Sequence, residues 1–255
     1  VYGSQQLSVT KRAVSLKSES ASKVFDGTAL TRPEVAGWKQ LGDEGFVDGQ
    51  VSDVRATGSA THVSDGKVAN AIAYTEGEGF NADNYAISKD EGVLSVTAKQ
   101  IAAADMTVQA PADVVYSGKA QQQKPVVKDG DKALAEGVDY ELTYSGNATD
   151  AGTVTVTVTG KGDYAGSVDV AYQITPAPLT VVTESANKVY DGKPLIAGGK
   201  VDGLVNGETV ELKLVGSQIK VGSSDNAYKI EWNGTAKRAN YRLEAESIGK
   251  LIVTE

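Results

Sequence analysis

An internal repeat constrains the fold of this 255-residue chain more than any other feature of its sequence. At an offset of 165 positions, the octapeptide SASKVFDG at 20–27 lies opposite SANKVYDG at 185–192. Further pairs follow at slightly smaller offsets: FVDG at 46–49 with LVNG at 204–207, and DNY at 83–85 with ANY at 239–241. Self-similarity at this period predicts an array of small folded units instead of one large domain.

The middle of the chain is a more distant copy, with VYSG at 115–118 and GDY at 162–164. We therefore expect three modules: a first repeat at 11–99, a divergent second repeat at 100–176 and a third repeat at 177–255. Their lengths suit small sandwich domains. Residues 7–10 align with 172–175, the end of the second repeat. Residues 1–10 are accordingly expected to be the remnant of an upstream module, or a linker, in a longer array.

The residue pattern predicts an all-β fold. Thr and Val alternate over 153–159, and apolar residues recur with a period of two over 168–174. Asp-Gly and Asn-Gly pairs, typical of tight turns, punctuate the chain. We expect small immunoglobulin-like β-sandwiches in an elongated array, with a stiff connection at 176–178 (Pro-Ala-Pro). The alternative is a β-grasp-like module with one short helix at 131–136; 101–105 is the other candidate for a helical turn.

Composition excludes several classes of function. There is no Cys, so disulfides, thiolate catalysis and zinc–thiolate sites are absent, and His62 is the single histidine. The net charge of −8 disfavours nucleic acid as a partner. No apolar stretch reaches the length that spans a bilayer, so no membrane insertion is expected. Without a Gly-x-Ser-x-Gly elbow to accompany His62, we expect no enzyme, no cofactor and no metal, and a monomer.

The repeats resemble the tandem MBG/YDG-type (Tyr-Asp-Gly) modules of bacterial cell-surface proteins and adhesins. KVYDG at 188–192, Asn240-Tyr241 and their counterparts in the first repeat carry the resemblance. The second repeat is similar to a partner repeat that often alternates with them. Phe25 and Ser117 depart from the pattern. The resemblance implies an extracellular, cell-wall-attached Gram-positive protein in which this region is a non-catalytic stalk or adhesive segment, spacing a binding head from the wall.

Trp38 is the candidate for ligand contact. It lies in a loop at 37–45 that the third repeat lacks, between Gly37 and Lys39. An exposed tryptophan can stack on a sugar or anchor a protein partner, which would make the chain a lectin-like module that binds host glycan, mucin or protein. The alternative is that Trp38 folds back over its own module.

An internal Lys–Asn isopeptide bond is a second candidate, because Cys-free surface modules sometimes gain rigidity in this way. The first repeat offers Lys23 and Asn84, with Asp26 or Glu19 as the acid. The third repeat offers Lys188 and Asn240, with Asp191 or Glu184. The alternation with Val24 and Val189 predicts that both lysines face solvent, which argues against the bond.

The other residues that recur at equivalent positions of the repeats are expected to have structural roles. Asp26 and Asp191 are expected to cap their own turns. The aromatic residue at the position before this turn in each repeat (Phe25, Tyr116, Tyr190) is expected in the core. The later tyrosines are expected to begin strands and to bond backbone through their hydroxyls (Tyr85, Tyr164, Tyr241). The acidic segments 129–131 with Glu136, and 43–44, are expected to be solvated turns and not calcium loops.

Overall fold

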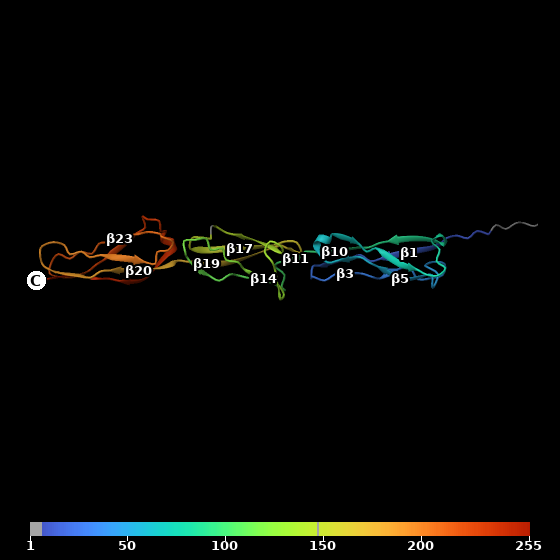
Figure 1. Ribbon diagram of the computed structural model, residues 1–255, viewed down its shortest axis with the longest axis horizontal. Coiled ribbons are helices and arrows are strands. Elements are labelled where there is room, and N and C mark those ends of the chain that lie inside the picture. The colour runs from blue at the N-terminus through green and yellow to red at the C-terminus, as the bar shows by residue number, and fades with distance from the viewer. Residues whose placement is uncertain (1–6, 147) are drawn as a thin grey trace, which may run out of the picture. The chain divides into compact units, whose positions relative to one another are not determined.

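The computed structural model describes residues 7–146 and 148–255, which fold almost entirely into strands and turns (Figure 1). The helical elements of this part of the chain are the single-turn 3-10 helices η1 (Val63–Asp65), η2 (Ala82–Asn84) and η3 (Arg238–Asn240). The all-β prediction is confirmed. Residues 1–6 of the expected upstream remnant lie outside the described residues, and 7–10 form no strand.

The prediction of a short helix at 131–136, which belonged to the alternative fold, is wrong. The Asp129-Gly130 turn reverses the chain, with Gly130 at φ 54°. Strand β15 (Lys132–Ala133) therefore pairs back on Lys128 and Asp129 as a hairpin. Residues 101–105 are turns, not a helix. A single helical turn fixes several dihedral angles for one hydrogen bond, so such short segments follow their neighbours instead of nucleating a helix.

The contacts between Cα atoms divide the chain into two compact units. Unit 1 takes in the described residues up to Ala104 together with 135–141 and 159–167. Unit 2 takes in 105–134, 142–158 apart from position 147, and 168–255. The division passes through the second repeat, so the strands of that repeat contribute to both units.

The first repeat pairs its strands mainly across long sequence distances. Strand β1 pairs in parallel with β9, from Arg12 opposite Tyr85 to Lys17 opposite Asp90, and antiparallel with β4. Strand β2 pairs in parallel with β10, which also pairs antiparallel with β7. The strands in chain order are β1 (Arg12–Ser18), β2 (Ala21–Val24), β3 (Leu30–Thr31), β4 (Val35–Ala36), β5 (Val51–Ala56), β6 (Ser59–Ala60), β7 (Lys67–Ala69), β8 (Ile72–Glu76), β9 (Tyr85–Asp90) and β10 (Val93–Thr97).

The third repeat reproduces this pairing, except that a single bridge between Leu195 and Gln218 stands in place of the pair β3–β6. Strand β20 pairs in parallel with β26 and antiparallel with β22, as β1 does with β9 and β4. Strand β27 pairs with β21 and β24, as β10 does with β2 and β7. The pair β23–β25 corresponds to β5–β8. Its strands are β20 (Ala177–Thr183), β21 (Ala186–Val189), β22 (Gly199–Asp202), β23 (Glu211–Leu214), β24 (Gly222–Asp225), β25 (Tyr228–Glu231), β26 (Tyr241–Ser247) and β27 (Lys250–Thr254).

The second repeat is built on a four-stranded sheet in the order β13-β19-β17-β16. The alternation read from the sequence is confirmed, because Val154, Val156 and Val158 are buried on β17, and Tyr172 and Ile174 on β19. Its strands are β11 (Lys99–Gln100), β12 (Met106–Gln109), β13 (Val114–Val115), β14 (Val126–Asp129), β15, β16 (Tyr140–Tyr144), β17 (Gly152–Gly160), β18 (Tyr164–Ala165) and β19 (Ser167–Thr175).

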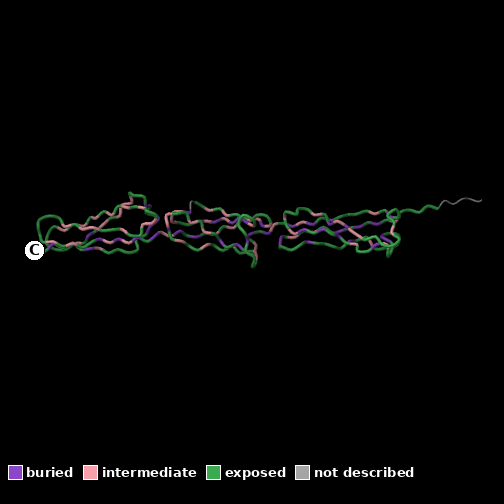
Figure 2. Tube along the Cα trace, viewed as in Figure 1, coloured by how far each residue is buried: buried purple, intermediate pink, exposed green. Residues whose placement is uncertain are grey.

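Buried residues alternate with more exposed ones along several of these strands (Figure 2). In unit 1, a cluster around Leu16, Phe46 and Tyr85 fills the first repeat. In unit 2, one cluster runs from Val156 and Tyr172 of the second repeat into Leu179 and Tyr241 of the third. Only Pro176 separates β19 from β20. The predicted proline connection is therefore extended, as expected, and the residues on either side of Pro176, Ile174 and Ala177, belong to one apolar cluster.

Candidate functional site

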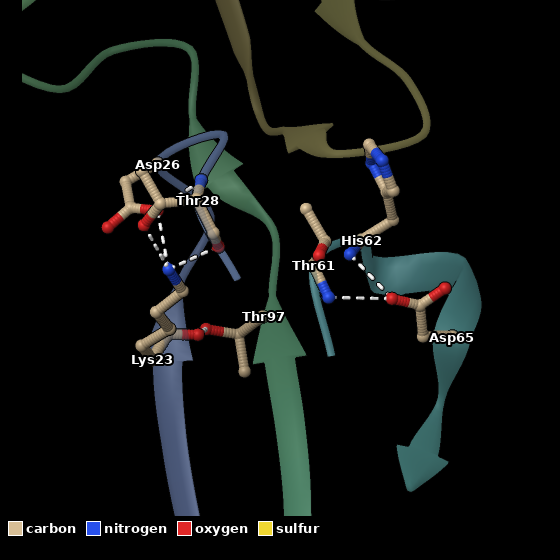
Figure 3. A network of polar contacts seen from close by, with 7 residues as sticks. All are labelled: Lys23, Asp26, Thr28, Thr61, His62, Asp65 and Thr97. Carbon is tan, nitrogen blue, oxygen red and sulfur yellow. Dashed lines mark hydrogen bonds and ion pairs between the residues drawn. The ribbon is translucent and has the colours of Figure 1, made fainter. Parts of the chain in front are cut away.

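The Asp-Gly turns that end β2 and β21 are held by local hydrogen bonds. Asp26 accepts from the backbone N–H of Thr28 at 2.8 Å and from the Lys23 ammonium at 2.6 Å (Figure 3). Asp191 likewise accepts from the N–H of Lys193 at 3.0 Å. The predicted capping role of both aspartates is confirmed. The lysine bond, followed by the backbone bond, lowers the pKa of Asp26 well below its usual value, and Lys188 lowers the pKa of Asp191.

The orientation predicted for the neighbouring lysines is wrong. The Lys23 side chain is only 20% exposed, whereas Val24 is 55% exposed, and Lys188 and Val189 repeat the pattern. The lysine ammonium folds back over the turn because it finds the aspartate and a backbone carbonyl there. In the third repeat, that carbonyl belongs to Lys193. Two strong acceptors outweigh the apolar preference of the valine at this strand end.

The aromatic residue that follows this strand is buried in the first two repeats and exposed in the third. Phe25 and Tyr116 are buried, at 5% and 4% exposed, as predicted. Tyr190 is 54% exposed, so the core prediction is wrong for this residue. All three occupy the same backbone position, since Phe25, Tyr116 and Tyr190 donate their N–H groups to the carbonyls of Thr97, Thr175 and Thr254, respectively. Burial therefore depends on what lies against the ring.

In unit 1, the ring of Phe25 is covered by Tyr164 of the second repeat. Their centroids lie 5.6 Å apart in an edge-to-face arrangement, a favourable geometry for aromatic pairs. Beside them, Asp163 accepts from His62 Nδ1 at 2.7 Å and from the Val63 N–H at 2.8 Å. We call this set of contacts the first joint.

The loop that presents His62 to the first joint is itself fixed. Asp65 accepts from the backbone N–H groups of Thr61 and His62 at 2.7 and 2.8 Å (Figure 3). These two bonds lower the pKa of Asp65, the His62 bond contributing most. The connecting backbone is paired as well: β11 runs parallel to β18, with Lys99 opposite Tyr164. His62 is thus held in place by Asp163 of the second repeat.

In unit 2, the ring of Tyr116 is covered in the same way by Tyr241 of the third repeat, at 5.5 Å and edge to face. Both hydroxyls donate to the carboxylate of Glu208, at 2.5 and 2.7 Å. Burial, reinforced by Glu208, raises the pKa of Tyr116, and burial raises that of Tyr241 to about 12. We call these contacts and those of Asp150 described next the second joint.

Polar contacts of Asn240 complete the second joint. Its Oδ1 accepts from the Ala151 N–H at 2.8 Å, and its Nδ2 donates to Asp150, also at 2.8 Å. Lys237 donates to the other oxygen of Asp150, and this bond raises the lysine pKa. Asn240 is almost fully buried. Residue 240 therefore has the place that Asp163 has in the first joint, immediately before the covering tyrosine.

The predicted tyrosine hydroxyl bonds are confirmed at two positions. Tyr85 begins β9 and accepts from the Val47 N–H at 3.2 Å, while donating to Gln50. Tyr241 begins β26 and accepts from the Val205 N–H at 3.2 Å. Tyr164 begins β18 with a buried ring.

A groove of about 870 Å³ lies on the third repeat, between β25 and β26. The residues that line it include aromatic (Tyr228, Trp232), basic (Arg238, Arg242), acidic (Glu246) and aliphatic (Ile248) side chains, with others. Tyr228 donates to Glu246 at 2.7 Å, and burial together with this carboxylate raises the Tyr228 pKa to about 12. Planar aromatic groups beside hydrogen-bonding charges are the chemistry that recognises sugars and acidic groups.

The same place in the first repeat is closed. Lys89, which corresponds to Glu246, donates to the Ile72 carbonyl at 2.7 Å and lies over the Tyr74 ring. Glu91, which corresponds to Ile248, accepts from the Ile72 N–H at 2.9 Å. These two side chains bridge β8 to β9. In the third repeat, Glu246 instead bonds to the Tyr228 hydroxyl, and Ile248 has no polar side-chain atom that could bond to β25.

Trp38 is half-buried against the core of the first repeat. Its carbonyl accepts from the Phe46 N–H, and the Lys39 ammonium lies 5.5 Å from the ring centroid. The guanidinium of Arg12 fixes the rest of the inserted loop by donating to the carbonyls of Gly42, Glu44 and Gly45. The arrangement is the fold-back alternative, with part of the ring left accessible.

The residues considered for isopeptide bonds are not brought together. The ammonium groups of Lys23 and Lys188 bond to Asp26 and Asp191 at the ends of β2 and β21. Asn84 is exposed in η2, next to Tyr85. Tyr85 pairs with Arg12 at the start of β1, whereas β2, which holds Lys23, follows the other end of β1. Asn240 is engaged by Asp150 and Ala151.

Among residues 7–146 and 148–255, no group of three or more His, Asp or Glu side chains is placed to hold a metal ion. The described part of the chain also has no helix long and apolar enough to cross a membrane. No family model matches the chain, and no curated protein matches it. The function is therefore inferred from the sequence resemblance given above and from the contacts within the chain.

Sequence reasoning missed two kinds of residue. One is the buried pair Asn70 and Asn226, which bond backbone inside the first and third repeats; the Asn-Ala dipeptide at the same place in both repeats was a usable signal. The other is Glu208, which receives both tyrosine hydroxyls. Its counterpart Gln50 does the same for Tyr85 alone, so only an alignment of the repeats would have drawn attention to it.

Proposed function

We propose that this chain is a non-catalytic repeat region of a bacterial, Gram-positive, cell-wall-attached surface protein, which spaces a binding head from the wall. In this proposal, the repeats are three small immunoglobulin-like β-modules in an elongated array. The observation that carries it is the construction of the joints. An aromatic pair and a set of hydrogen bonds close each joint, and a single residue separates the strands that lead into it.

This construction would suit a mechanical role, because bending at either joint would separate packed aromatic rings. A free linker of a few residues leaves neighbouring domains able to reorient. Here the apolar cluster of unit 2 passes through the second joint, so reorientation would expose buried rings. The acidic, Cys-free surface would keep such an array soluble and monomeric.

A second candidate function is direct binding of host glycan or mucin, and the groove of the third repeat favours it. Arg238 and Arg242 line this groove together with Tyr228 and Trp232. Aromatic faces with adjacent charged donors bind sugars that carry carboxylate or sulfate groups.

A glycan array and a mucin pull-down with the full chain distinguish the two functions. A spacer gives no saturable binding. Binding through the groove gives a saturable signal that is lost in Arg238→Ala/Arg242→Ala, with an unchanged melting temperature, because both arginines are exposed. A signal lost instead in Trp38→Ala would assign binding to the inserted loop of the first repeat.

A further inference from the structure

The exposed ring of Tyr190 marks a surface that is covered in the other two repeats. The N–H bonds to Thr97, Thr175 and Thr254 show that Phe25, Tyr116 and Tyr190 are equivalent positions. In the first two repeats, a tyrosine that begins a strand of the next repeat lies edge to face on the ring. The third repeat has the same strand end, with the ring bare.

The second component of each joint has its equivalent there as well. In the first joint, Asp163 binds His62 and the N–H of Val63; in the second, Asn240 binds Asp150 and the N–H of Ala151. Lys220 and Val221 align with His62 and Val63 in sequence. Lys220 and Val221 also correspond to Asp150 and Ala151 of the second repeat. Both pairs directly precede a glycine that begins a strand, and the two glycines have similar backbone angles: Gly152 at φ 147° and Gly222 at φ 139°. Val221 is 51% exposed.

The residue at this position matches the charge of what it meets. His62, which can be cationic, meets the carboxylate of Asp163. Asp150 meets the ammonium of Lys237 and the amide Nδ2 of Asn240. Lys220 is exposed and cationic, so charge complementarity calls for a carboxylate, as in the first joint.

We propose that Tyr190, Lys220 and Val221 form a docking site for the end of a repeat of the second kind, one that presents an Asp-Tyr pair like Asp163-Tyr164. In that complex, the incoming tyrosine covers the Tyr190 ring. The incoming aspartate accepts from the Lys220 ammonium and from the Val221 N–H. The proposal rests on the geometry of the two joints and is independent of the stalk function.

Two fusions to the full chain test the site. One adds a copy of residues 99–176 after Glu255, which then stands where Ala98 stands; the other adds a copy of 177–255, with Glu255 in the place of Pro176. Hydroxyl-radical labelling read by mass spectrometry reports the exposure of Tyr190. We expect several-fold loss of Tyr190 labelling with the 99–176 copy, and a smaller loss with the 177–255 copy, which presents Asn240.

Charge variants sharpen the test. Asp163→Asn within the added copy should restore part of the labelling. Lys220→Asp should reverse the preference, because an acidic residue suits Lys237 and Asn240 of the 177–255 copy. Unchanged Tyr190 labelling in the 99–176 fusion, with Tyr172 of the added copy protected as in a folded core, overturns the proposal. Concentration-dependent protection in the unfused chain also overturns it, since the occupant would then be the Asn84-Tyr85 end of a second copy.

If the added copies do not fold, the unfused chain still tests whether the residue at the position of His62 must match the charge of its partner. His62→Lys places the residue of the third repeat in the first joint and should leave the labelling of Tyr164 unchanged. His62→Asp opposes Asp163 and should raise that labelling about two- to fivefold, the range expected for an exposed ion pair. Equal labelling of Tyr164 in the two variants overturns the rule.

Discussion

Replacing Tyr116 by alanine should destabilise unit 2 far more than the same replacement of Tyr190. Tyr116 is 4% exposed, packs on Tyr241 and donates to Glu208. Deleting a buried aromatic side chain costs about 3–5 kcal/mol, a figure that already includes the edge-to-face contact. Tyr190 is 54% exposed, and substitutions at such surface positions usually cost about 0.5 kcal/mol or less. The two residues share a backbone position, so each variant is a matched control for the other.

Urea denaturation followed by Trp232 fluorescence measures the difference. Trp38 and Trp232 are the two tryptophans of the chain, and Trp232 stacks on Tyr241, so a Trp38→Phe background isolates the second joint. For a slope of roughly 2–3 kcal/mol per molar urea, Tyr116→Ala should lower the midpoint by about 1 M or more, and Tyr190→Ala by about 0.2 M or less.

Equal shifts for Tyr116→Ala and Tyr190→Ala would refute the reasoning, since the aromatic side chain would then stabilise its own turn and not the joint. Tyr116→Phe refines the result. It keeps the ring and removes one of the two bonds to Glu208, which still accepts from Tyr241. The expected cost is about 0.5–1.5 kcal/mol.

Three further predictions follow from other contacts. Asn70→Ala should lower the unfolding free energy of unit 1 by at least about 2 kcal/mol, measured by Trp38 fluorescence, because the amide is buried and bonds to Gly58, Glu19 and Arg32; exposed Asn84→Ala should change it little. The folded-state pKa of Asp26 is lowered, so the stabilisation that its carboxylate contributes is present above pH 4 and is lost as the pH falls below that value. Thermal melts of Asp26→Asn at low pH should show less acid destabilisation than those of the native chain. Parallel curves of melting temperature against pH would contradict this. The pKa of Tyr241 is raised to about 12, so the stabilisation that its neutral hydroxyl contributes is complete below about pH 10 and is lost between pH 10 and 12. Thermal melts in this pH range should therefore change in Tyr241→Phe, and melts that the substitution leaves unchanged would contradict the prediction.

Local features of the fold were predictable because they depend on neighbours in sequence. The alternation of 153–159 placed three valines on one face, and Asp26 capped its own turn two residues away. The equivalence of the first and third repeats was visible in the octapeptides and reappears in the pairing of the strands. These signals come either from residues close together in sequence or from a sequence motif that occurs in both repeats.

The joints were not predictable, because their partners are remote. His62 meets Asp163 across 101 positions, and Tyr116 meets Glu208 across 92. Tyr190 has nearly the same local sequence as Phe25, yet its ring is exposed where that of Phe25 is buried. The lysine orientation failed for a different reason, although its partners are close in sequence: periodicity assigns faces by hydrophobicity, but Lys23 is held by hydrogen bonds to Asp26 and Thr28.

Small-angle X-ray scattering of the full chain in dilute solution tests the proposed spacer most directly. Strands that rise about 3.3 Å per residue, in modules placed end to end, give a length of roughly 100–120 Å and a radius of gyration near 30 Å. A single compact domain of this size would have a radius of gyration of about 18 Å. A value near 30 Å that persists at high salt is the result expected of a stiff array; a value near 18 Å would contradict it.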